Sequence, residues 1–255
     1  MKTSRLLAAL LLTTMGASAQ TAYQIGFGNT ATLDTYLSQE KFSGGGITLL
    51  QSAESGRQHS LWTWRLEQQL NLSLPEHSST RADEIEGAYG LFVGRYHSWT
   101  IADNHLRLQA GLMANATVGF IYLTQNSNNP AQARLSLMLM PAAAATARFA
   151  IRRRHHFAVR YETRLPLAGM TFSPNYGQSY YEIFNLGNYD HNIVPTTFIS
   201  APYIQQQLNL GYHLGRSTMV TIGYLGDYQQ LSVNNLKQHV YSHRIMLGLV
   251  KKVKM

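Results

Sequence analysis

Two groups of serine and histidine residues have the side-chain types that nucleophilic catalysis uses. One group is His77 with Ser79, and the other consists of Ser173, Ser179, Asp190 and His191. A histidine that takes a proton from serine, with a carboxylate to orient it, is the arrangement of a hydrolase or acyltransferase. Ten histidines in a serine-rich chain also produce such groupings by chance. The sequence therefore keeps a lipid-modifying enzyme as an alternative and predicts a non-enzymatic protein.

Metal and cofactor chemistry has no support in the sequence. The chain contains no cysteine. Only His239 and His243 stand four residues apart, the spacing that places two ligands on one face of a helix, and they lie in a segment whose alternation predicts a strand. We predict no metal site and no cofactor.

Charged side chains recur at alternate positions in segments whose other positions are apolar. If the apolar positions face outward, the charged residues share one interior: Arg65, Glu67, Arg107, Arg134, Arg148, Arg160, Glu162, Arg164, Asp227 and Arg244, with Glu84 and Glu86 as further members. An unpaired buried charge costs several kcal/mol. We expect these side chains to pair and close the interior; the alternative is a narrow ion path lined by the excess of arginine.

A third candidate is the aromatic segment 172–199. Its ring-bearing residues lie among asparagines and glycines: Tyr176, Tyr180, Tyr181, Phe184, Tyr189 and His191. A connection of this length folds on itself. Two hypotheses remain open: a lid over the interior with its rings at the level of lipid headgroups, or a surface that binds a glycan or a protein. The segment Leu33–Ser38 is expected to pack against it.

The elements that must position these residues are long strands. From His105 to Tyr122 the even positions are apolar, from Leu106 through Phe120, while most odd positions, among them Arg107 and Asn115, are polar or small. A tilted strand needs about 9–11 residues to cross a membrane, whereas strands of soluble sandwiches average about 5–6. The pattern predicts an all-β, closed, antiparallel transmembrane β-barrel.

The connections predict the topology of this barrel. Short turns are expected near 53–58, 99–104, 151–155 and 215–217, and longer ones near 74–83, 123–130, 172–199 and 231–238. Short and long connections alternate in outer-membrane barrels. With 23–30 as the first strand the count is ten, and eight or twelve strands are the alternatives.

The N-terminal residues predict export. Lys2 and Arg5 precede the apolar run Leu6–Leu12, and Ala17-Ser18-Ala19 is a signal-peptidase pattern that places cleavage between Ala19 and Gln20. We therefore expect residues 1–19 to be a signal peptide and residues 20–255 to form the barrel. The net charge of +8 falls to +6 without Lys2 and Arg5, which favours anionic lipid over nucleic acid as the partner of an exported chain.

Several motifs resemble an uncharacterised family of outer-membrane β-barrels from Bacteroidetes. These are Ile25-Gly-Phe-Gly-Asn, Leu33-Asp-Thr-Tyr-Leu-Ser, Ser173-Pro-Asn-Tyr-Gly-Gln-Ser-Tyr-Tyr-Glu-Ile-Phe with the following Leu-Gly-Asn, and Gly248-Leu-Val-Lys-Lys. The resemblance covers the chain from residue 20 onward. It implies the barrel fold and an outer-membrane location, and it implies no activity.

Together these observations predict a surface-binding or envelope-structural protein that acts through its external loops. The expected partners are outer-membrane lipid or lipopolysaccharide, the barrel-assembly machinery, and an extracellular glycan or protein.

Overall fold

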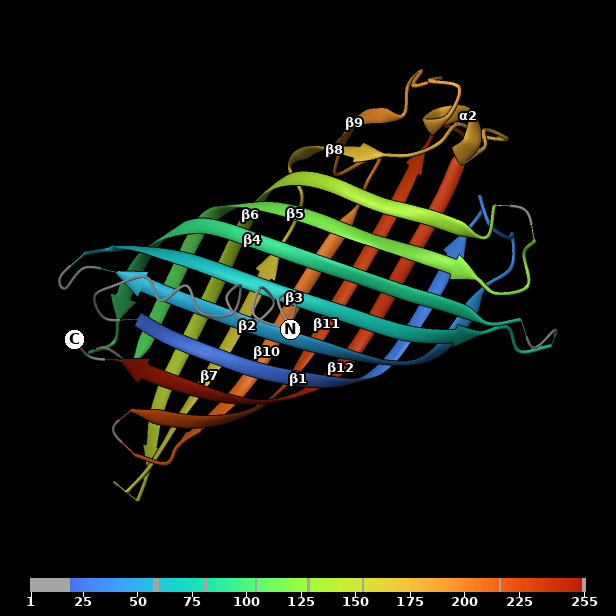
Figure 1. Cartoon of the computed structure of the whole chain (residues 1–255). Helices are drawn as coiled ribbons and strands as arrows, with labels where there is room; N and C mark the ends of the chain where they lie inside the picture. The colour runs from blue at the N-terminus through green and yellow to red at the C-terminus, as the bar shows by residue number, and fades with distance from the viewer. Residues whose placement is uncertain are drawn as a thin grey trace, which may run out of the picture.

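The computed structural model describes residues 19–253, apart from 57–59, 80–81, 104, 128, 153 and 216. Ten long strands form a closed antiparallel wall (Figure 1). They are β1 (Ala19–Asp34), β2 (Phe42–Gly56), β3 (Trp62–Glu76), β4 (Glu84–Ile101), β5 (Leu106–Leu123), β6 (Ala131–Ile151), β7 (His155–Arg164), β10 (Tyr203–His213), β11 (Thr218–Val233) and β12 (Leu236–Val253). The predicted barrel and its strand number are confirmed. The predicted signal peptide lies outside the described residues except for Ala19.

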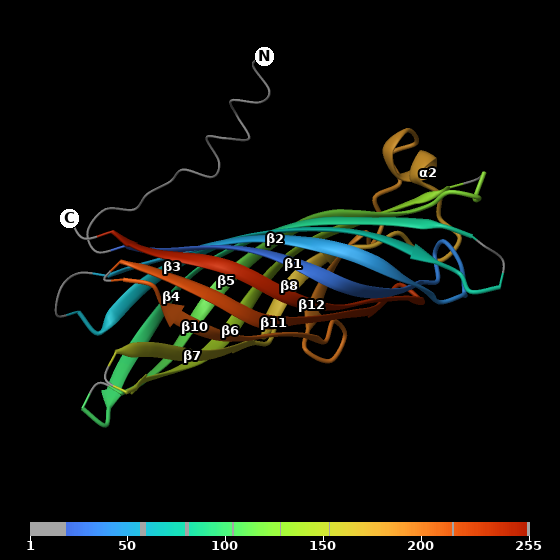
Figure 2. The same ribbon diagram turned by 90° about the horizontal axis from the view of Figure 1, so that it is seen from below.

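The barrel closes because the first and last strands pair along their whole length. The ladder runs from Ala19 opposite Val253 to Asp34 opposite Gln238. The start of β1 and the end of β12 lie at one end of the barrel, which we call the base (Figure 2). The opposite end, which we call the mouth, carries the longer connections.

Side chains alternate between the two faces of the wall as the sequence predicts. In β5 Leu112, Val118 and Phe120 are exposed on the outer face, while Met113 and Asn115 point inward and are buried. Successive side chains of a strand point to opposite faces, so one apolar face and one polar face follow directly from the period-two pattern.

The connection predicted for 231–238 is wrong. Strands β11 and β12 run on to Val233 and Leu236 and are joined by a two-residue turn. Asn234 and Asn235 both have positive φ, at 52° and 58°. Asparagine tolerates the left-handed region, and tight hairpin turns with two such residues match the twist of the flanking strands.

The chain leaves the ten-stranded wall near the mouth. Strand β7 pairs with β10 only as far as Arg164 opposite Gln205. After Pro166 the chain continues along β6 as β8 (Ala168–Phe172), whose other edge pairs with β9 (Ile193–Thr197). Between them lies the helix α2 (Tyr180–Phe184). The segment predicted as the loop 172–199 is therefore an ordered strand–helix–strand unit. No described helix is long and apolar enough to cross a membrane.

Candidate functional site

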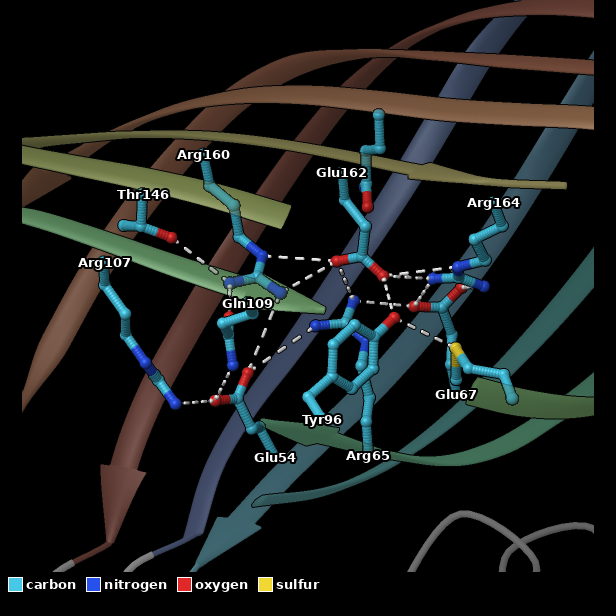
Figure 3. A network of polar contacts seen from close by, with 12 residues as sticks. Glu54, Arg65, Glu67, Tyr96, Arg107, Gln109, Thr146, Arg160, Glu162 and Arg164 are labelled. Atoms are coloured by element: carbon cyan, nitrogen blue, oxygen red, sulfur yellow. Dashed lines mark hydrogen bonds and ion pairs between the residues drawn. The ribbon is translucent and has the colours of Figure 1, made fainter. Parts of the chain in front are cut away.

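Four buried side chains form a closed ring of charge in the middle of the lumen, which we call the central cluster: Arg65, Glu67, Glu162 and Arg164 (Figure 3). Arg65 Nη2 lies 2.8 Å from Glu67 Oε2 and 3.2 Å from Glu162 Oε2. Arg164 Nη1 lies 2.8 Å from Glu67 Oε1, and its Nη2 lies 2.9 Å from Glu162 Oε1. Each arginine contacts both glutamates. With two positive and two negative charges, the cluster is electrically neutral.

These four residues come in two pairs from two strands of the wall. Arg65 and Glu67 are two residues apart on β3, and Glu162 and Arg164 are two apart on β7. Residues two apart share one face of a strand. Tyr96 donates its hydroxyl to Glu162 at 3.0 Å, and the Arg164 guanidinium lies 4.7 Å from the centre of the Phe92 ring.

The ion pairs continue towards the base. Arg107 contacts Glu54 at 2.8 Å, and Arg160 contacts Glu162 at 2.9 Å and Glu54 at 3.8 Å. Sequence reasoning missed Glu54 because it placed a turn at 53–58. The alternation of β2 carries the signal that was overlooked, because Glu54 has the same parity as the inward-facing Thr48.

Towards the mouth the charges are held differently. Arg134 pairs with Glu86, and Glu84 accepts a hydrogen bond from Thr32. Asp227 accepts hydrogen bonds from amide side chains, those of Gln69 at 3.0 Å and Gln205 at 3.1 Å among them.

Four residues of the predicted paired network are not in ion pairs among the described residues: Glu84, Arg148, Asp227 and Arg244. The Arg244 guanidinium donates instead to hydroxyl and carbonyl oxygens, for example Thr30 Oγ1 at 2.6 Å and Asn29 O at 2.6 Å. Gly46 leaves room for it, since a Cβ there would lie 2.5 Å from Arg244 Nη2. Neutral oxygens satisfy a guanidinium when enough of them converge, so a carboxylate partner was not required.

Apolar side chains complete the closure of the lumen. Phe92, Tyr96, Met113 and Met140 pack in one buried cluster, and Leu50, Leu225 and Met246 form another. Nearer the mouth, Leu37 and Phe42 pack against Ile121. The interior is thus filled by side chains, as expected for a barrel of this strand number.

Below the central cluster the lumen widens into a cavity of about 90 Å³, which we call the basal cavity. It contains the side chain of Arg148, which makes no ion pair or side-chain hydrogen bond with the described residues. Its other charged lining residues are Arg65, Arg107, Arg160, Lys252 and Glu54.

The strand–helix–strand unit at the mouth, residues 168–197, is here called the cap (Figure 1). Tyr180 donates its hydroxyl to Gln132 Oε1 and accepts the N–H of Ala133, both at 2.7 Å. The Asn234 side-chain amide donates to the carbonyl oxygens of Ser173 and His191. The cap is therefore attached to two separate parts of the rim.

A third attachment joins the cap to the β1–β2 connection. The ring of Tyr36 meets that of Tyr180 edge to face, with centroids 5.7 Å apart, so the expected packing of the segment 33–38 against the cap is present. Burial raises the pKa of the Tyr180 hydroxyl.

The six predicted binding residues fall into two sets. Tyr180 faces the barrel, and its ring stacks against Phe184 at 6.0 Å. The side chains of the remaining residues are exposed: Tyr176, Tyr181, Phe184, Tyr189 and His191. His191 also contacts the carboxylate of Asp190 at 2.5 Å.

The serines of the cap are not arranged with His191 as a catalytic triad. The Ser179 hydroxyl accepts the backbone N–H of Glu182 at the start of α2, and the Ser173 hydroxyl donates to Pro174 O. Neither hydroxyl contacts His191 in the described structure.

His77 and Ser79 come closer to such a geometry. Ser79 Oγ lies 3.3 Å from His77 Nδ1, and Glu40 lies 3.3 Å from His77 Nε2. The backbone N–H of Ser79 points at the same Nδ1 at 3.4 Å. A general base must aim its lone pair at the hydroxyl, and here the backbone amide competes for it. The arrangement is a local contact that closes a turn. No group of three metal-ligating side chains occurs among the described residues.

The family of the chain follows from its sequence. The model of a family described as "Protein of unknown function (DUF3316)" matches residues 10–255. The chain belongs to this family. Membership in DUF3316 is consistent with the resemblance to an uncharacterised family, while the Bacteroidetes origin stays a prediction. None of the curated proteins matches this DUF3316 chain.

Solved structures agree on the fold of the DUF3316 chain. The transport unit of the autotransporter AIDA-I from Escherichia coli has a TM-score of 0.52 and 9% identity, over 99% of this chain and 96% of that one. The β domain of the Bordetella autotransporter BrkA has a TM-score of 0.45 and 10% identity, over 92% and 99%. The likeness to the AIDA-I transport unit is one of fold alone, that of an outer-membrane β-barrel.

Proposed function

We propose that this protein is a non-enzymatic barrel of the outer membrane that holds its cap outside the cell as a rigid binding surface. In this orientation the mouth faces the exterior and the base faces the periplasm. Three tryptophans on the outer face near the base support the placement in a membrane: Trp62, Trp64 and Trp99. Tryptophan is enriched at membrane–water interfaces. The guanidinium of Arg95 lies over the Trp62 ring at 4.7 Å, where it can reach lipid headgroups.

The observation that carries the proposal is the exposed apolar surface of an ordered cap. Tyr181 is 61% exposed, Phe184 60% and Leu186 65%, all within or directly after α2. A contiguous exposed apolar patch marks an interaction site. Anchored aromatic rings lose little conformational entropy on binding, because the tertiary contacts of the cap already order them.

The type of ligand follows from the residues around the rings. Leu186 and Ile193 are exposed beside the tyrosines. Sugar-binding surfaces use aromatic faces with polar neighbours, whereas exposed aliphatic side chains are buried by other proteins. The cap therefore favours a protein ligand, and a glycan is the competing outcome of the test.

The absence of cysteine allows a direct test of exposure. In intact cells Tyr181→Cys should react with a membrane-impermeant maleimide, while Leu214→Cys, at the base, should react only after lysis. Labelling of both variants in intact cells, or of neither, would contradict the orientation.

Binding is tested with the same cells on immobilised extracellular-matrix proteins and on a glycan array. The double variant Tyr181→Ser/Phe184→Ser should lose retention on protein. Leu214→Ser is the control, because it removes a similarly exposed apolar side chain at the other end of the barrel. Retention only on glycans would show that the ligand is a sugar and not a protein. Equal retention by both variants would show that the cap is not the binding surface.

A further inference from the structure

The basal cavity carries more positive charge than the structure neutralises. Three arginines line it below the central cluster: Arg107, Arg148 and Arg160. Glu54 is the only carboxylate among the described residues that line it. One negative charge against these three positive charges leaves an excess of two. In a cavity with low-dielectric walls such an excess concentrates the electrostatic field and attracts anions.

Hydrogen-bond donors of the cavity are also left without partners. The guanidinium of Arg148 makes no ion pair or hydrogen bond with the described residues. Arg65 Nε and Thr221 Oγ1 are buried in the described structure and have no hydrogen-bond partner. All three groups belong to residues that line the basal cavity. Buried polar groups in folded proteins are nearly always satisfied, so Arg65 Nε and Thr221 Oγ1, together with the partly exposed Arg148, can donate to an acceptor that enters the cavity.

The surrounding residues hold this geometry in place. Arg160 is fixed by Glu162 at 2.9 Å and donates to Gln109 Oε1 at 2.7 Å (Figure 3). On the opposite wall Gln207 donates to Gln24 at 2.7 Å, and Gln24 donates to Asn209 at 2.8 Å. Arg160 and the amides of the opposite wall are therefore ordered before a ligand arrives, which lowers the entropic cost of binding.

We propose that the basal cavity is a binding site for a small, multiply charged phosphate-bearing solute that enters from the periplasm. Guanidinium groups match phosphate oxygens with paired, charge-assisted hydrogen bonds. The excess of two charges favours a polyanion over a monocarboxylate. In this arrangement Arg148 contacts the ligand directly, while Arg107 and Arg160 hold it against the floor of the cavity.

The probe is inorganic pyrophosphate, titrated by calorimetry into the full-length barrel in a zwitterionic detergent at low salt. We expect one site per chain, with an affinity that falls as sodium chloride is added. Arg148→Gln should weaken binding by about tenfold or more, because it removes a charge-assisted contact. Acetate should not saturate the site. The absence of saturable pyrophosphate binding, or equal binding of acetate, would overturn the proposal.

A matched control separates the cavity from the outer surface. Lys251 is the neighbour of Lys252 on β12 but points to the outer face, so Lys251→Gln removes the same charge at the same level of the barrel. This variant should change pyrophosphate affinity by less than about twofold. A soluble short-chain phosphatidylglycerol distinguishes a lipid source of phosphate. If that lipid binds and Lys251→Gln weakens it as much as Arg148→Gln does, the site is a headgroup contact at the rim and the proposal fails. Unchanged heat modifiability on SDS gels shows that both variants are folded.

Discussion

At the scale of single residues, the central cluster shows how the lumen tolerates buried charge. Each of its four side chains contacts both cluster members of opposite charge at 2.8–3.2 Å. The desolvation cost of such ions can exceed their attraction, so the cluster adds little net stability. Removal of one member is a different matter, since it leaves the buried cluster with a net charge.

This difference gives a stability prediction. Arg164→Met should lower the free energy of unfolding by about 3 kcal/mol or more, because it removes an ion pair from both Glu67 and Glu162 and leaves the buried cluster with a net negative charge. Arg107→Met should cost about 1 kcal/mol or less, because Arg107 pairs at the half-exposed end of the network. Urea unfolding in lipid vesicles, followed by tryptophan fluorescence, measures both. Similar losses in the two variants would show that the cluster does not behave as one unit.

The turn formed by His77 and Ser79 allows a test of the enzyme alternative. Because the backbone amide of Ser79 shares the histidine nitrogen with its hydroxyl, we expect the hydroxyl to be unactivated. A fluorophosphonate probe should not label the wild-type barrel in outer-membrane fractions. Labelling that disappears in Ser79→Ala would establish a nucleophile here and refute the non-enzymatic proposal.

Most residues that face the lumen could be predicted at this scale, but the residues that each of them contacts could not. The period of two assigns Arg65 and Glu162 to the inner face without knowledge of the fold. Which of them meet depends on the register and tilt of strands far apart in the sequence, and a single sequence does not give these. For this reason the oxygens around Arg244 and the isolation of Arg148 were not foreseen.

At the scale of elements, the turn at Asn234 has two separate roles. Its backbone adopts the left-handed conformation that joins β11 to β12, and its side chain holds the cap. Glycine keeps the first role and abolishes the second, because it accepts positive φ but has no amide.

Asn234→Gly should therefore release the cap while the barrel stays closed. We expect faster cleavage of the segment 172–199 by proteinase K in intact cells, with unchanged heat modifiability. Asn235→Gly is the control, since it makes the same substitution in the same turn without touching the cap contacts. Equal cleavage of the two variants would mean that Asn234 does not anchor the cap.

The first turn of α2 makes the cap sensitive to acid. The carboxylate of Glu182 accepts the backbone N–H of Ser179 at 2.7 Å and its hydroxyl at 2.9 Å. These hydrogen bonds hold the pKa of Glu182 below its ordinary value. A depressed pKa contributes stability above the unfolded-state value of about 4.3, and this stability is lost as the pH falls through the folded-state value.

Hydrogen exchange of α2, corrected for intrinsic rates, should accordingly be constant between about pH 7 and 5 and rise below about pH 4. Glu182→Gln should already show faster exchange at pH 7. Asp190→Asn serves as the control, because Asp190 is a carboxylate of the same cap that caps no helix. A flat profile down to pH 3 would exclude the capping box as the acid-sensitive group.

Long elements were predictable from the sequence, whereas short ones were not. The eighteen residues of β5 repeat their pattern often enough to be unambiguous. The elements β8, α2 and β9 have five residues each, which is too few for a pattern to repeat. The error at 231–238 has a different cause. Gln230, Ser232 and Lys237 belong to strands whose outer face is polar near the mouth, so the apolar half of the alternation disappears where the ladder continues.

At the scale of the whole molecule, the closed lumen leads to a prediction about transport. Single-channel recordings of the wild-type barrel in planar bilayers should show no stable conductance. The quadruple variant with alanine at Arg65, Glu67, Glu162 and Arg164 should admit ions, because it removes the neutral cluster that crosses the lumen. Steady conductance in the wild type would favour the narrow-channel alternative.

The pairing of β1 with β12 sets the order of events during assembly. Its ladder joins residues about as far apart as the chain permits, from Ala19 with Val253 onward. Contacts so distant in sequence form slowly, because a very long loop must close before they contribute. Until then β1 carries an unpaired edge, which is a template for aggregation. The barrel therefore cannot close before its last strand has been synthesised. We expect the lifetime of that unclosed intermediate to govern the yield of folded protein.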